Sequence, residues 1–370
     1  MAKTPLAGIK VVELARILAG PWAGQVLADL GADVVKVESP GGDDTRGWGP
    51  PFIERADGSR DAAYFHAANR GKASIIADFR DPHDLAHVLD LIRDADVVIE
   101  NFKLGGLVPF GLDYESVKAI NPRVVYCSIT GFGQDGPYAA RPGYDFIVQG
   151  MSGIMDLTGA PDGPPMKIGV AYADILTGLY AVIGIQAALH MRQQTGQGQM
   201  VDMALLDVMV GTLANQAMNY LASGHCPTRL GNAHPNIVPY EAFACADGWA
   251  IIAVGNDSQF ARLADLLDLN PPENWATNAG RVADRAAVSA AVAGRTQDWE
   301  RDALLAALEG EGIPAGPINT VEQALADPQI AARGMVLSMA EGIRGLRTPI
   351  RFSDADLAAP RPSPMLGEEG

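Results

Sequence analysis

One carboxylate in the sequence stands where it could act as a nucleophile. Asp174 follows a loop rich in glycine, proline and aromatic residues (131–169), and it opens the segment 174–193, which is apolar on almost all sides and predicts a buried helix. Aspartate is a preferred N-cap residue, so a structural role at the helix start is the simplest interpretation. The helix dipole would also favour the ionised carboxylate, and the buried helix would hold it rigidly for attack. The two roles are compatible, and both stay open.

Basic side chains gather in the loops that follow predicted strands. They are Arg16, Arg46, Arg70, Lys72, Lys103, Arg141 and Lys167. The whole chain carries a net charge of −16 from 28 basic and 44 acidic residues, so no nucleic-acid partner is expected. Cations concentrated at the carboxyl ends of parallel strands would instead suit a small polyanionic ligand. Scattered, solvated charges are the alternative.

Several common catalytic and cofactor-binding motifs are missing from the sequence. The first predicted strand is followed by ARILAGPWAG (15–24) and not by GxGxxG, and there is no GxxxxGK[ST] phosphate loop. The segment GMSGI (150–154) differs from the GxSxG nucleophile elbow. The sequence therefore does not support dinucleotide binding, ATP-driven chemistry or a serine nucleophile.

No metal site is expected. His83 and His87 are four residues apart on a predicted helix, but no third ligand or neighbouring glutamate accompanies them. A solvated helix face is the better interpretation. The three cysteines are far apart, without a CxxC motif, and Cys127 falls in an apolar strand where a buried, inert thiol is expected.

Apolar runs and helical spacing alternate along the first part of the chain. The runs at 9–14 and 33–38 flank a helical pattern at 21–30, which predicts a βαβ unit and a parallel sheet. The alternation continues with helices expected at 84–93, 114–120 and 206–222 and strands at 96–100, 123–130 and 199–205. This pattern predicts a doubly wound, Rossmann-like α/β domain.

Length and pattern together predict two domains. A length of 370 residues corresponds to about two domains of ordinary size. We expect a large Rossmann-like domain at 1–222, to which 323–370 return, and a small α+β domain at 226–322 that contains a hairpin turning at Asp247–Gly248. The N-terminus lacks a signal-peptide pattern and no apolar run reaches membrane-spanning length. We therefore expect a cytoplasmic protein without a membrane partner.

A set of segments spread from about Leu6 to Leu366 carries a family resemblance. They are ELARILAGPWAGQVLADLGADVVKVE (13–38), GDDTRGWGPPF (42–52), NRGK (69–72), VIENFKLGGL (98–107), NPRVVYCSITGFGQDGP (121–137), GYDF (143–146) and ADILTGLYA (173–181). Together they resemble the family III (CaiB/BaiF-type) CoA-transferases, which include formyl-CoA and carnitine CoA-transferases. Any one segment alone would be a weak signal.

The resemblance implies a site and an assembly. The family's nucleophilic aspartate falls on Asp174, and its CoA-contacting positions fall on Leu18, Ala19, Asn69, Arg70, Lys72, Asn101, Phe102, Lys103, Tyr144 and Asp145. Some members of the family carry basic side chains at the positions of Ser39 and the residues around Pro109, and this chain lacks them there. Lys72 and Arg141 are therefore expected to hold the CoA phosphates. The resemblance also implies an interlocked homodimer, with CoA as a substrate and no tightly bound cofactor.

The implied reaction moves CoA from an acyl-CoA to a carboxylic acid through covalent intermediates on Asp174. Two other functions stay open. An α-methylacyl-CoA racemase of the same fold would need an acid/base pair, normally a histidine and the aspartate, and this chain has Tyr144 where the histidine would be. A non-catalytic CoA-binding protein would have no need for an aspartate at position 174.

The segments 42–52, GNAHPNIVPYEAF (231–243) and GPIN (316–319) resemble the succinate–hydroxymethylglutarate branch of the family. We therefore expect succinyl-CoA as the donor and a dicarboxylate such as glutarate as the acceptor. The second carboxylate must be paired when the site closes, because an unpaired buried charge is costly. We expect Arg46 to offer a bidentate guanidinium and His234 a further donor.

Overall fold

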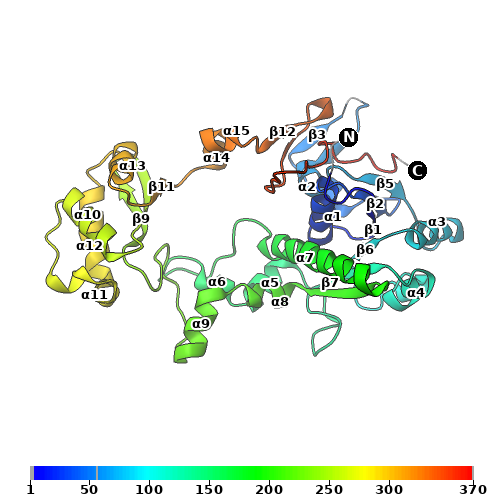
Figure 1. The fold of residues 1–370 in the computed structure, drawn as a ribbon, viewed down its shortest axis with the longest axis horizontal. Helices are drawn as coiled ribbons and strands as arrows, with labels where there is room; N and C mark the ends of the chain where they lie inside the picture. The colour runs from blue at the N-terminus through cyan, green and yellow to red at the C-terminus, as the bar shows by residue number, and fades with distance from the viewer. Residues whose placement is uncertain (1–3, 56, 369–370) are drawn as a thin grey trace. The chain divides into compact units, whose positions relative to one another are not determined.

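A computed structural model describes residues 4–55 and 57–368, which divide into two units (Figure 1). Unit 1 takes in the chain up to Ile154, the stretch Lys167–Ser223 and the chain from Pro328 on. Unit 2 consists of Met155–Met166 and Gly224–Asp327. The stretch Met155–Met166, which the sequence pattern assigns to the large domain, therefore groups with unit 2.

Unit 1 is built on a parallel sheet of six strands in the order β5-β2-β1-β6-β7-β8 (Figure 1). The strands are β1 (Lys10–Glu13), β2 (Asp33–Glu38), β5 (Ala73–Ile76), β6 (Val97–Glu100), β7 (Val125–Thr130) and β8 (Gln199–Ala204). Every neighbouring pair is parallel, so the predicted parallel α/β sheet is confirmed. Strand β5 was not predicted, because its apolar run is short and directly follows the polar segment Asn69–Lys72.

The helices of unit 1 are α1 (Ala19–Asp29), α2 (Ala63–Ala68), α3 (Pro82–Arg93), α4 (Tyr114–Ile120), α5 (Asp145–Met151), α7 (Tyr172–Thr195), α8 (Leu205–Gly211), α9 (Ala214–Ser223) and α15 (Pro328–Ala332), and α6 (Ile154–Leu157) spans the boundary with unit 2. The single helix predicted at 206–222 is divided into α8 and α9. Ala214 adopts a left-handed φ of 46° at this point, which a right-handed helix cannot accommodate.

Smaller elements complete unit 1. They are η1 (Asp44–Gly47), η2 (Val108–Phe110), η4 (Ala340–Gly342) and the antiparallel pairs β3 (Phe52–Glu54) with β4 (Arg60–Ala62) and β12 (Val336–Ser338) with β13 (Arg344–Leu346). The C-terminal segment lies along this unit: Arg361 donates a hydrogen bond to the Gly71 carbonyl at 2.7 Å, and Arg55 to the Ser363 carbonyl at 2.6 Å.

Alternate residues of the central strands face opposite layers of helices. Val11 and Val97 belong to the core that includes side chains of α1 and α7, whereas Val12 and Val98 belong to the core that includes side chains of α3 and α4. Burial on both faces explains why these strands read as continuous apolar runs. The loops at the carboxyl ends of the strands are thereby brought to one edge of the sheet.

Helix α7 runs for 24 residues and begins two residues before its predicted start. Among the described residues, it is the one helix that is long and apolar enough to cross a membrane, which corrects the expectation that no segment reaches that length. It packs against α1, α5, α8, β7 and β8, as the core helix of an α/β unit does. Gly196 ends it in the left-handed conformation, with a φ of 76°.

Unit 2 has a three-stranded antiparallel sheet in the order β11-β10-β9. Its elements are β9 (Tyr240–Cys245), β10 (Gly248–Ala253), α10 (Asp257–Leu266), η3 (Glu273–Ala276), α11 (Asn278–Ala283), α12 (Arg285–Thr296), α13 (Arg301–Gly310), β11 (Ala315–Pro317) and α14 (Val321–Ala326). Strands β9 and β10 form the predicted hairpin, but it turns at Ala246–Asp247, one residue before the predicted position, because Gly248 pairs with Cys245 in the ladder. Phe243, Ile252 and Leu263 lie in the buried core of unit 2.

Candidate active site

A cavity of about 500 Å³ lies in unit 1 at the edge where the chain leaves β1, β6 and β7. Its walls come from Arg16–Ala19 after β1, Asn101–Leu104 after β6, Ile129–Gly131 at the end of β7, Ala139 and Arg141–Tyr144, together with Asp174 from α7. Ligands of open α/β sheets bind at this carboxyl edge, where loops from several strands meet. The cavity is therefore the candidate binding site of unit 1.

Asp174 lies in the first turn of α7, but it does not cap the helix. The N-cap residue is Ala171. The carboxylate that accepts a hydrogen bond from the first turn is that of Asp145, which lies 2.8 Å from the Ala173 nitrogen. The other oxygen of Asp145 accepts one from Gln149 at 2.8 Å. The capping interpretation of Asp174 is therefore wrong. Within residues 4–55 and 57–368, its half-buried carboxylate has no hydrogen-bond or ion-pair partner.

Burial raises the pKa of Asp174 to about 7, and the neighbouring negative charge of Asp145 adds to the effect. A carboxylate that is poorly solvated and unpaired is a better nucleophile than one held by hydrogen bonds. Strongly shifted carboxyl groups of this kind gather at functional sites.

The shifted pKa predicts how activity depends on pH. Because attack requires the ionised form, we expect kcat/KM for an acyl-CoA to fall about tenfold per pH unit once the pH drops below about 7. Asp145→Asn removes the neighbouring charge while its amide oxygen can still accept from Ala173, so the break in the profile should move to lower pH. A profile that stays flat from about pH 5 to 8 would contradict this assignment.

Helix α1 begins beside Asp174. Gly178 lies four residues further along α7, on the same face as Asp174. A Cβ atom on Gly178 would come within 2.7 Å of the Ala19 carbonyl oxygen and 3.1 Å of the Trp22 Cβ atom. Glycine at this position therefore lets α7 approach α1 closely, which brings the carboxylate next to the first turn of α1.

Comparison with known proteins identifies the family. The family model described as CoA-transferase family III matches residues 6–370. The chain belongs to this family. The resemblance read from the sequence is thereby confirmed, and the protein is an enzyme that transfers CoA.

Named relatives match this CoA-transferase over nearly its whole length. It is 59% identical to succinate–glutarate CoA-transferase of Agrobacterium fabrum, over 99% of this chain and 94% of that protein. It is 40% identical to human succinyl-CoA:glutarate CoA-transferase, over 98% of this chain and 84% of that protein. The crystal structure of a CaiB/BaiF family protein from Brucella suis is 64% identical and has a TM-score of 0.91, covering 99% of this chain and 97% of that one.

Much of the expected CoA site of the enzyme is brought together in the cavity. The lining includes Leu18, Ala19, Asn101, Phe102, Lys103, Arg141, Tyr144 and Asp174. Asn101 also holds the loop after β1, since its side chain accepts from the Arg16 N–H at 3.0 Å and donates to the Arg16 carbonyl at 2.7 Å. The Arg141 guanidinium lies 4.5 Å from the Tyr138 ring centroid.

Lys72 and Asn69 lie in the interior and do not line the cavity. The Lys72 ammonium group donates to Glu13 at 2.9 Å, to the Asn69 side chain at 2.8 Å and to the Pro21 carbonyl at 2.9 Å. Both side chains are buried. The expectation that Lys72 holds a CoA phosphate is therefore corrected: its three donor positions are already used inside the protein.

Arg70 and Asp145 also have partners within the protein. Arg70 is buried and forms an ion pair with Asp29, which in turn accepts from Thr348 of the C-terminal segment. The two oxygens of Asp145 serve Ala173 and Gln149, as described above. Both side chains therefore have structural roles: Arg70 anchors the C-terminal segment, and Asp145 orders the helix start that carries Asp174. Contacts of either residue with CoA stay a prediction.

Arg46 is not available for a substrate carboxylate. Its guanidinium pairs with both oxygens of Glu38 at 2.7 and 2.8 Å and with Asp61 at 3.0 Å. The same group lies 3.7 Å from the Phe65 ring centroid and donates to the Pro364 carbonyl. Arg46 does form the predicted kind of interaction, a bidentate arginine–carboxylate pair, but the carboxylate is that of Glu38 in the same chain.

His234 belongs to unit 2. Its Nδ1 atom accepts a hydrogen bond from the Asn236 N–H at 3.1 Å, and its ring lies 5.2 Å from that of Tyr240. These contacts order the loop before β9. A role for His234 in substrate binding stays a prediction.

Trp48, Tyr64 and Asp44 were not predicted as site residues. Trp48 and Asp44 line the cavity; Trp48 makes an edge-to-face contact with Tyr64 at 5.3 Å, and Asp44 pairs with Arg16 at 3.0 Å. Burial raises the pKa of Tyr64, and the charge of Asp174 contributes next, so the phenol lies within electrostatic reach of that carboxylate. The motif GDDTRGW contains both Asp44 and Trp48, but a motif by itself assigns no role to its individual residues.

The described part of the chain holds no cluster of three or more His, Cys, Asp or Glu side chains that could bind a metal. His83 is 95% exposed at its side chain, on the solvent face of α3. Cys127 is buried in β7, and burial raises the pKa of its thiol. Both side chains lie where the sequence pattern placed them.

Proposed function

We propose that this enzyme transfers CoA from succinyl-CoA to glutarate or a closely related dicarboxylate. Two relatives that match nearly the whole chain are named for these substrates. The single observation that carries the chemistry is Asp174, a half-buried carboxylate with a raised pKa in the wall of the cavity.

Asp174 supplies a covalent route for the exchange. One of its oxygens attacks the thioester carbon of succinyl-CoA, the C–S bond breaks, and a mixed anhydride and CoA thiolate form. The thiolate attacks the Asp174 carbonyl and releases succinate, leaving an aspartyl-CoA thioester. The acceptor carboxylate attacks this thioester, and the thiolate it displaces then attacks the acceptor's carbonyl to give the new acyl-CoA and free Asp174. One thioester is broken and one is made, so no ATP is consumed.

The cavity suits anionic substrates and intermediates. Arg16, Lys103 and Arg141 contribute positive charge to its lining, and such charge can pair with CoA phosphates or with the second carboxylate of a dicarboxylate. Helix α1 begins at Ala19 without a side-chain cap, so its first-turn N–H groups can stabilise an oxyanion that develops near Asp174.

An acceptor panel tests the proposed substrates. With succinyl-CoA as the donor, the panel contains glutarate, adipate, mesaconate, hydroxymethylglutarate, oxalate, carnitine and acetate, and acyl-CoA products are measured by chromatography and mass spectrometry. We expect glutarate or another of the longer dicarboxylates to give the highest kcat/KM. Highest activity with carnitine, acetate or oxalate would contradict the proposal.

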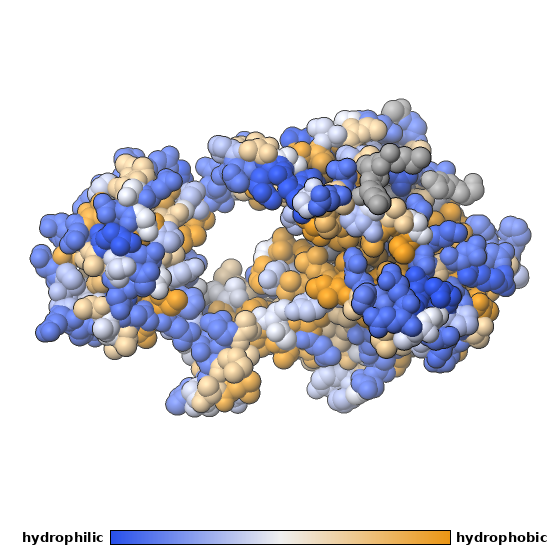
Figure 2. Space-filling view, viewed as in Figure 1, coloured by the Kyte–Doolittle hydropathy of each residue, from blue (hydrophilic) through white to orange (hydrophobic). Residues whose placement is uncertain are grey.

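We also propose that the enzyme is an interlocked homodimer. Large apolar side chains of α7 are exposed in the single chain, among them Leu179 at 40% and Ile183 at 61%, and those of α9 include Leu221 at 72%. Figure 2 shows hydrophobic residues gathered over α7. An apolar surface of this kind on a core helix is characteristic of a face that a second copy covers.

Light scattering tests the assembly. We expect a mass of about twice 38.9 kDa at every concentration down to the nanomolar range, because interlocked chains cannot separate without unfolding. Ile183→Glu should prevent assembly, whereas Ile120→Glu, which changes a partly exposed residue at the end of α4, should leave the mass unchanged. A stable, folded wild-type monomer would overturn the proposal.

We also propose that the enzyme is cytoplasmic. Cys127, Cys226 and Cys245 are free thiols in the structure, which suits a reducing compartment. Fractionation of cells that produce the protein, with a cytoplasmic marker enzyme as the reference, tests this location directly; recovery apart from the marker would contradict it.

A further inference from the structure

The loop that follows β1 is held by side chains from other elements at four of its backbone groups. The Ala15 carbonyl accepts from Lys36 at 2.8 Å, and Asn101 bonds both the N–H and the carbonyl of Arg16. The Ile17 N–H donates to the carboxylate of Asp43, at 3.2 Å to its nearer oxygen. This loop forms one wall of the cavity that contains Asp174.

Ile17 is in a conformation that its side chain disfavours. Its φ is +72°, in the left-handed region, where a β-branched residue is an outlier and normally gives way to glycine. The next residues, Leu18 and Ala19, line the cavity and begin α1. The shape of this cavity wall therefore depends on contacts that hold Ile17 against its own preference.

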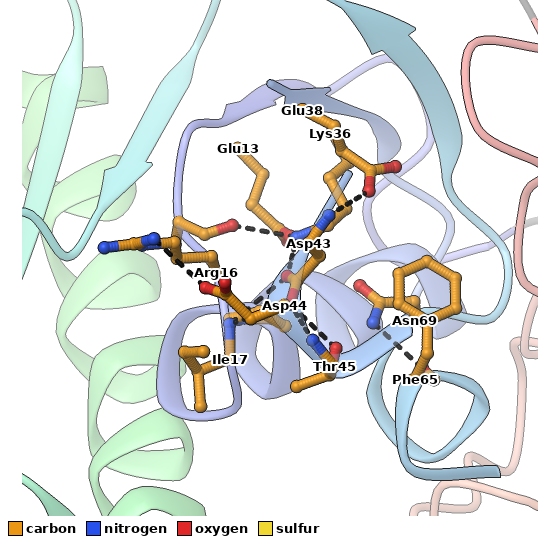
Figure 3. Close-up of polar contacts among 12 residues, drawn as sticks. Glu13, Arg16, Ile17, Lys36, Glu38, Asp43, Asp44, Thr45, Phe65 and Asn69 are labelled. Carbon is orange, nitrogen blue, oxygen red and sulfur yellow. Dashed lines mark hydrogen bonds and ion pairs between the residues drawn. The ribbon is translucent and has the colours of Figure 1, made fainter. Parts of the chain in front are cut away.

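Asp43 accepts the hydrogen bond from the Ile17 N–H (Figure 3). Its carboxylate is buried, pairs with Lys36 at 2.9 Å and accepts from the Thr45 N–H at 3.0 Å and the Thr45 hydroxyl at 2.7 Å. Its own N–H donates to Glu38 at 2.9 Å. Burial acts to raise the pKa of Asp43, but the charge of Lys36 and the Thr45 hydrogen bonds outweigh it and lower the value, so the carboxylate stays ionised.

Lys36 links Asp43 to the residues at the end of β1. Its ammonium group is fully buried and contacts Glu13 at 3.2 Å as well as Asp43 and the Ala15 carbonyl. Figure 3 shows the side chains of Glu13, Lys36 and Asp43 converging, while Arg16 points away from them. Glu13, Lys36 and Asp43 do not line the cavity, so this ionic network acts on the cavity wall through the backbone of Ala15 and Ile17.

We propose that Asp43 is a positioning residue, which fixes Ile17 in its left-handed conformation and thereby holds the wall formed by Leu18 and Ala19 in place beside Asp174. This role rests on the proposed function of the cavity. Asp43 itself does not line the cavity, so it acts on the reaction through the loop and makes no contact of its own with substrate. A displacement of about 1 Å in such a wall can reduce the rate about 100-fold.

Asp43→Asn is the principal test, with Asp29→Asn as its matched control. An amide at position 43 keeps one acceptor oxygen where the carboxylate has two, so in either orientation its NH2 group faces donors that the carboxylate accepts from, either Lys36 and the Ile17 N–H or the Thr45 N–H. The amide also loses the charge that pairs with Lys36, so the hold on the loop is weakened. We expect kcat for CoA transfer to fall about 10- to 100-fold while KM for succinyl-CoA changes little. Asp29→Asn removes another carboxylate of a largely buried ion pair in unit 1, away from the cavity. It should reduce thermal stability but leave kcat unchanged.

Two further measurements separate positioning from folding. Hydrogen exchange of a peptide covering residues 14–20 should be faster in Asp43→Asn than in the wild type. In an Ile17→Gly background, where the left-handed conformation is no longer disfavoured, Asp43→Asn should cost less in kcat than it does in the wild type. If Asp43→Asn does not fold, Thr45→Val, which keeps every charge, should give a smaller fall in kcat and the same faster exchange.

The outcomes distinguish this inference from the proposed function. If the wild type transfers CoA and Asp43→Asn, or failing that Thr45→Val, keeps both its kcat and its exchange pattern, the positioning role is wrong. An equal loss of kcat in Asp29→Asn would also overturn it, because it would show a general effect of destabilisation. If the wild type transfers CoA to no acceptor, the proposed function fails, and exchange at residues 14–20 still tests whether Asp43 holds the loop.

Discussion

Replacing Asp174 with asparagine is expected to reduce kcat for CoA transfer at least about 10,000-fold, as the removal of covalent nucleophiles does in other enzymes. The asparagine side chain has almost the same shape as aspartate, but it has no anionic oxygen to attack the thioester. Since no hydrogen bond or ion pair within the described residues depends on this carboxylate, the variant should keep the structure of the cavity. Its affinity for CoA, measured by calorimetry, should stay within about threefold of the wild type.

Stability provides the control for this variant. The pKa of Asp174 is raised in the folded protein, from 3.8 to about 7, so the unfolded chain loses this proton at lower pH than the folded one does. Ionisation of Asp174 therefore lowers the free energy of unfolding. This loss of stability grows from about pH 4 to about pH 7 and is constant at higher pH. Asp174→Asn should accordingly unfold at a higher temperature than the wild type at pH 8, with a smaller difference at pH 5.

Two results would contradict the nucleophile assignment. One is substantial activity in Asp174→Asn after removal of contaminating wild-type enzyme. The other is a loss of activity that accompanies a lower unfolding temperature, because that would give the aspartate a structural role.

Replacing Lys72 with methionine is expected to destabilise the fold by about 3 kcal/mol, which is the lower end of the range for breaking a buried ion pair. Lys72 and Glu13 are both fully buried. Removal of the ammonium group leaves Glu13 with Lys36 as its one remaining cation among the described residues, at 3.2 Å, and leaves the Asn69 oxygen and the Pro21 carbonyl without this donor. The unfolding temperature should fall by several degrees.

The matched control is Lys10→Met, which removes a lysine whose side chain is 59% exposed and which lies 3.9 Å from Asp94. A surface pair of this kind contributes little, so the unfolding temperature should hardly change. If Lys72 instead held a CoA phosphate, Lys72→Met would raise KM for acyl-CoA and leave the unfolding temperature unchanged. That outcome would restore the role that the family resemblance suggested.

The sheet and its order of elements could be predicted because local patterns encode them. The strands β1, β2, β6 and β7 are apolar runs between helical patterns, and burial on both faces of a parallel sheet demands such runs. The break between α8 and α9 could not be predicted, because nothing in the sequence around Ala214 signals its left-handed φ of 46°. Strand β5 was missed because a four-residue run carries too little periodicity.

Site residues could be predicted only where their position just after a predicted strand brings them to the edge of the sheet. Asn101 and Lys103 follow directly on a strand, so the edge of the sheet brings them to the cavity. Arg46 and Lys72 are of the right chemical type but pair with Glu38 and Glu13, which lie 8 and 59 residues away in the chain. A sequence pattern does not show which cation pairs with a buried carboxylate. It could therefore not show that Arg46 and Lys72 pair inside the protein and do not lie in the binding site.

The most direct test of the account is the capture of the covalent intermediate. The enzyme is mixed with succinyl-CoA in the absence of an acceptor, quenched with hydroxylamine and digested, and the peptides are analysed by mass spectrometry. Hydroxylamine should convert the activated carboxyl group to a hydroxamate on the peptide that contains Asp174, and the modification should be absent from Asp174→Asn. A hydroxamate on a different residue, or an unmodified wild type that still turns over succinyl-CoA and glutarate, would contradict the account.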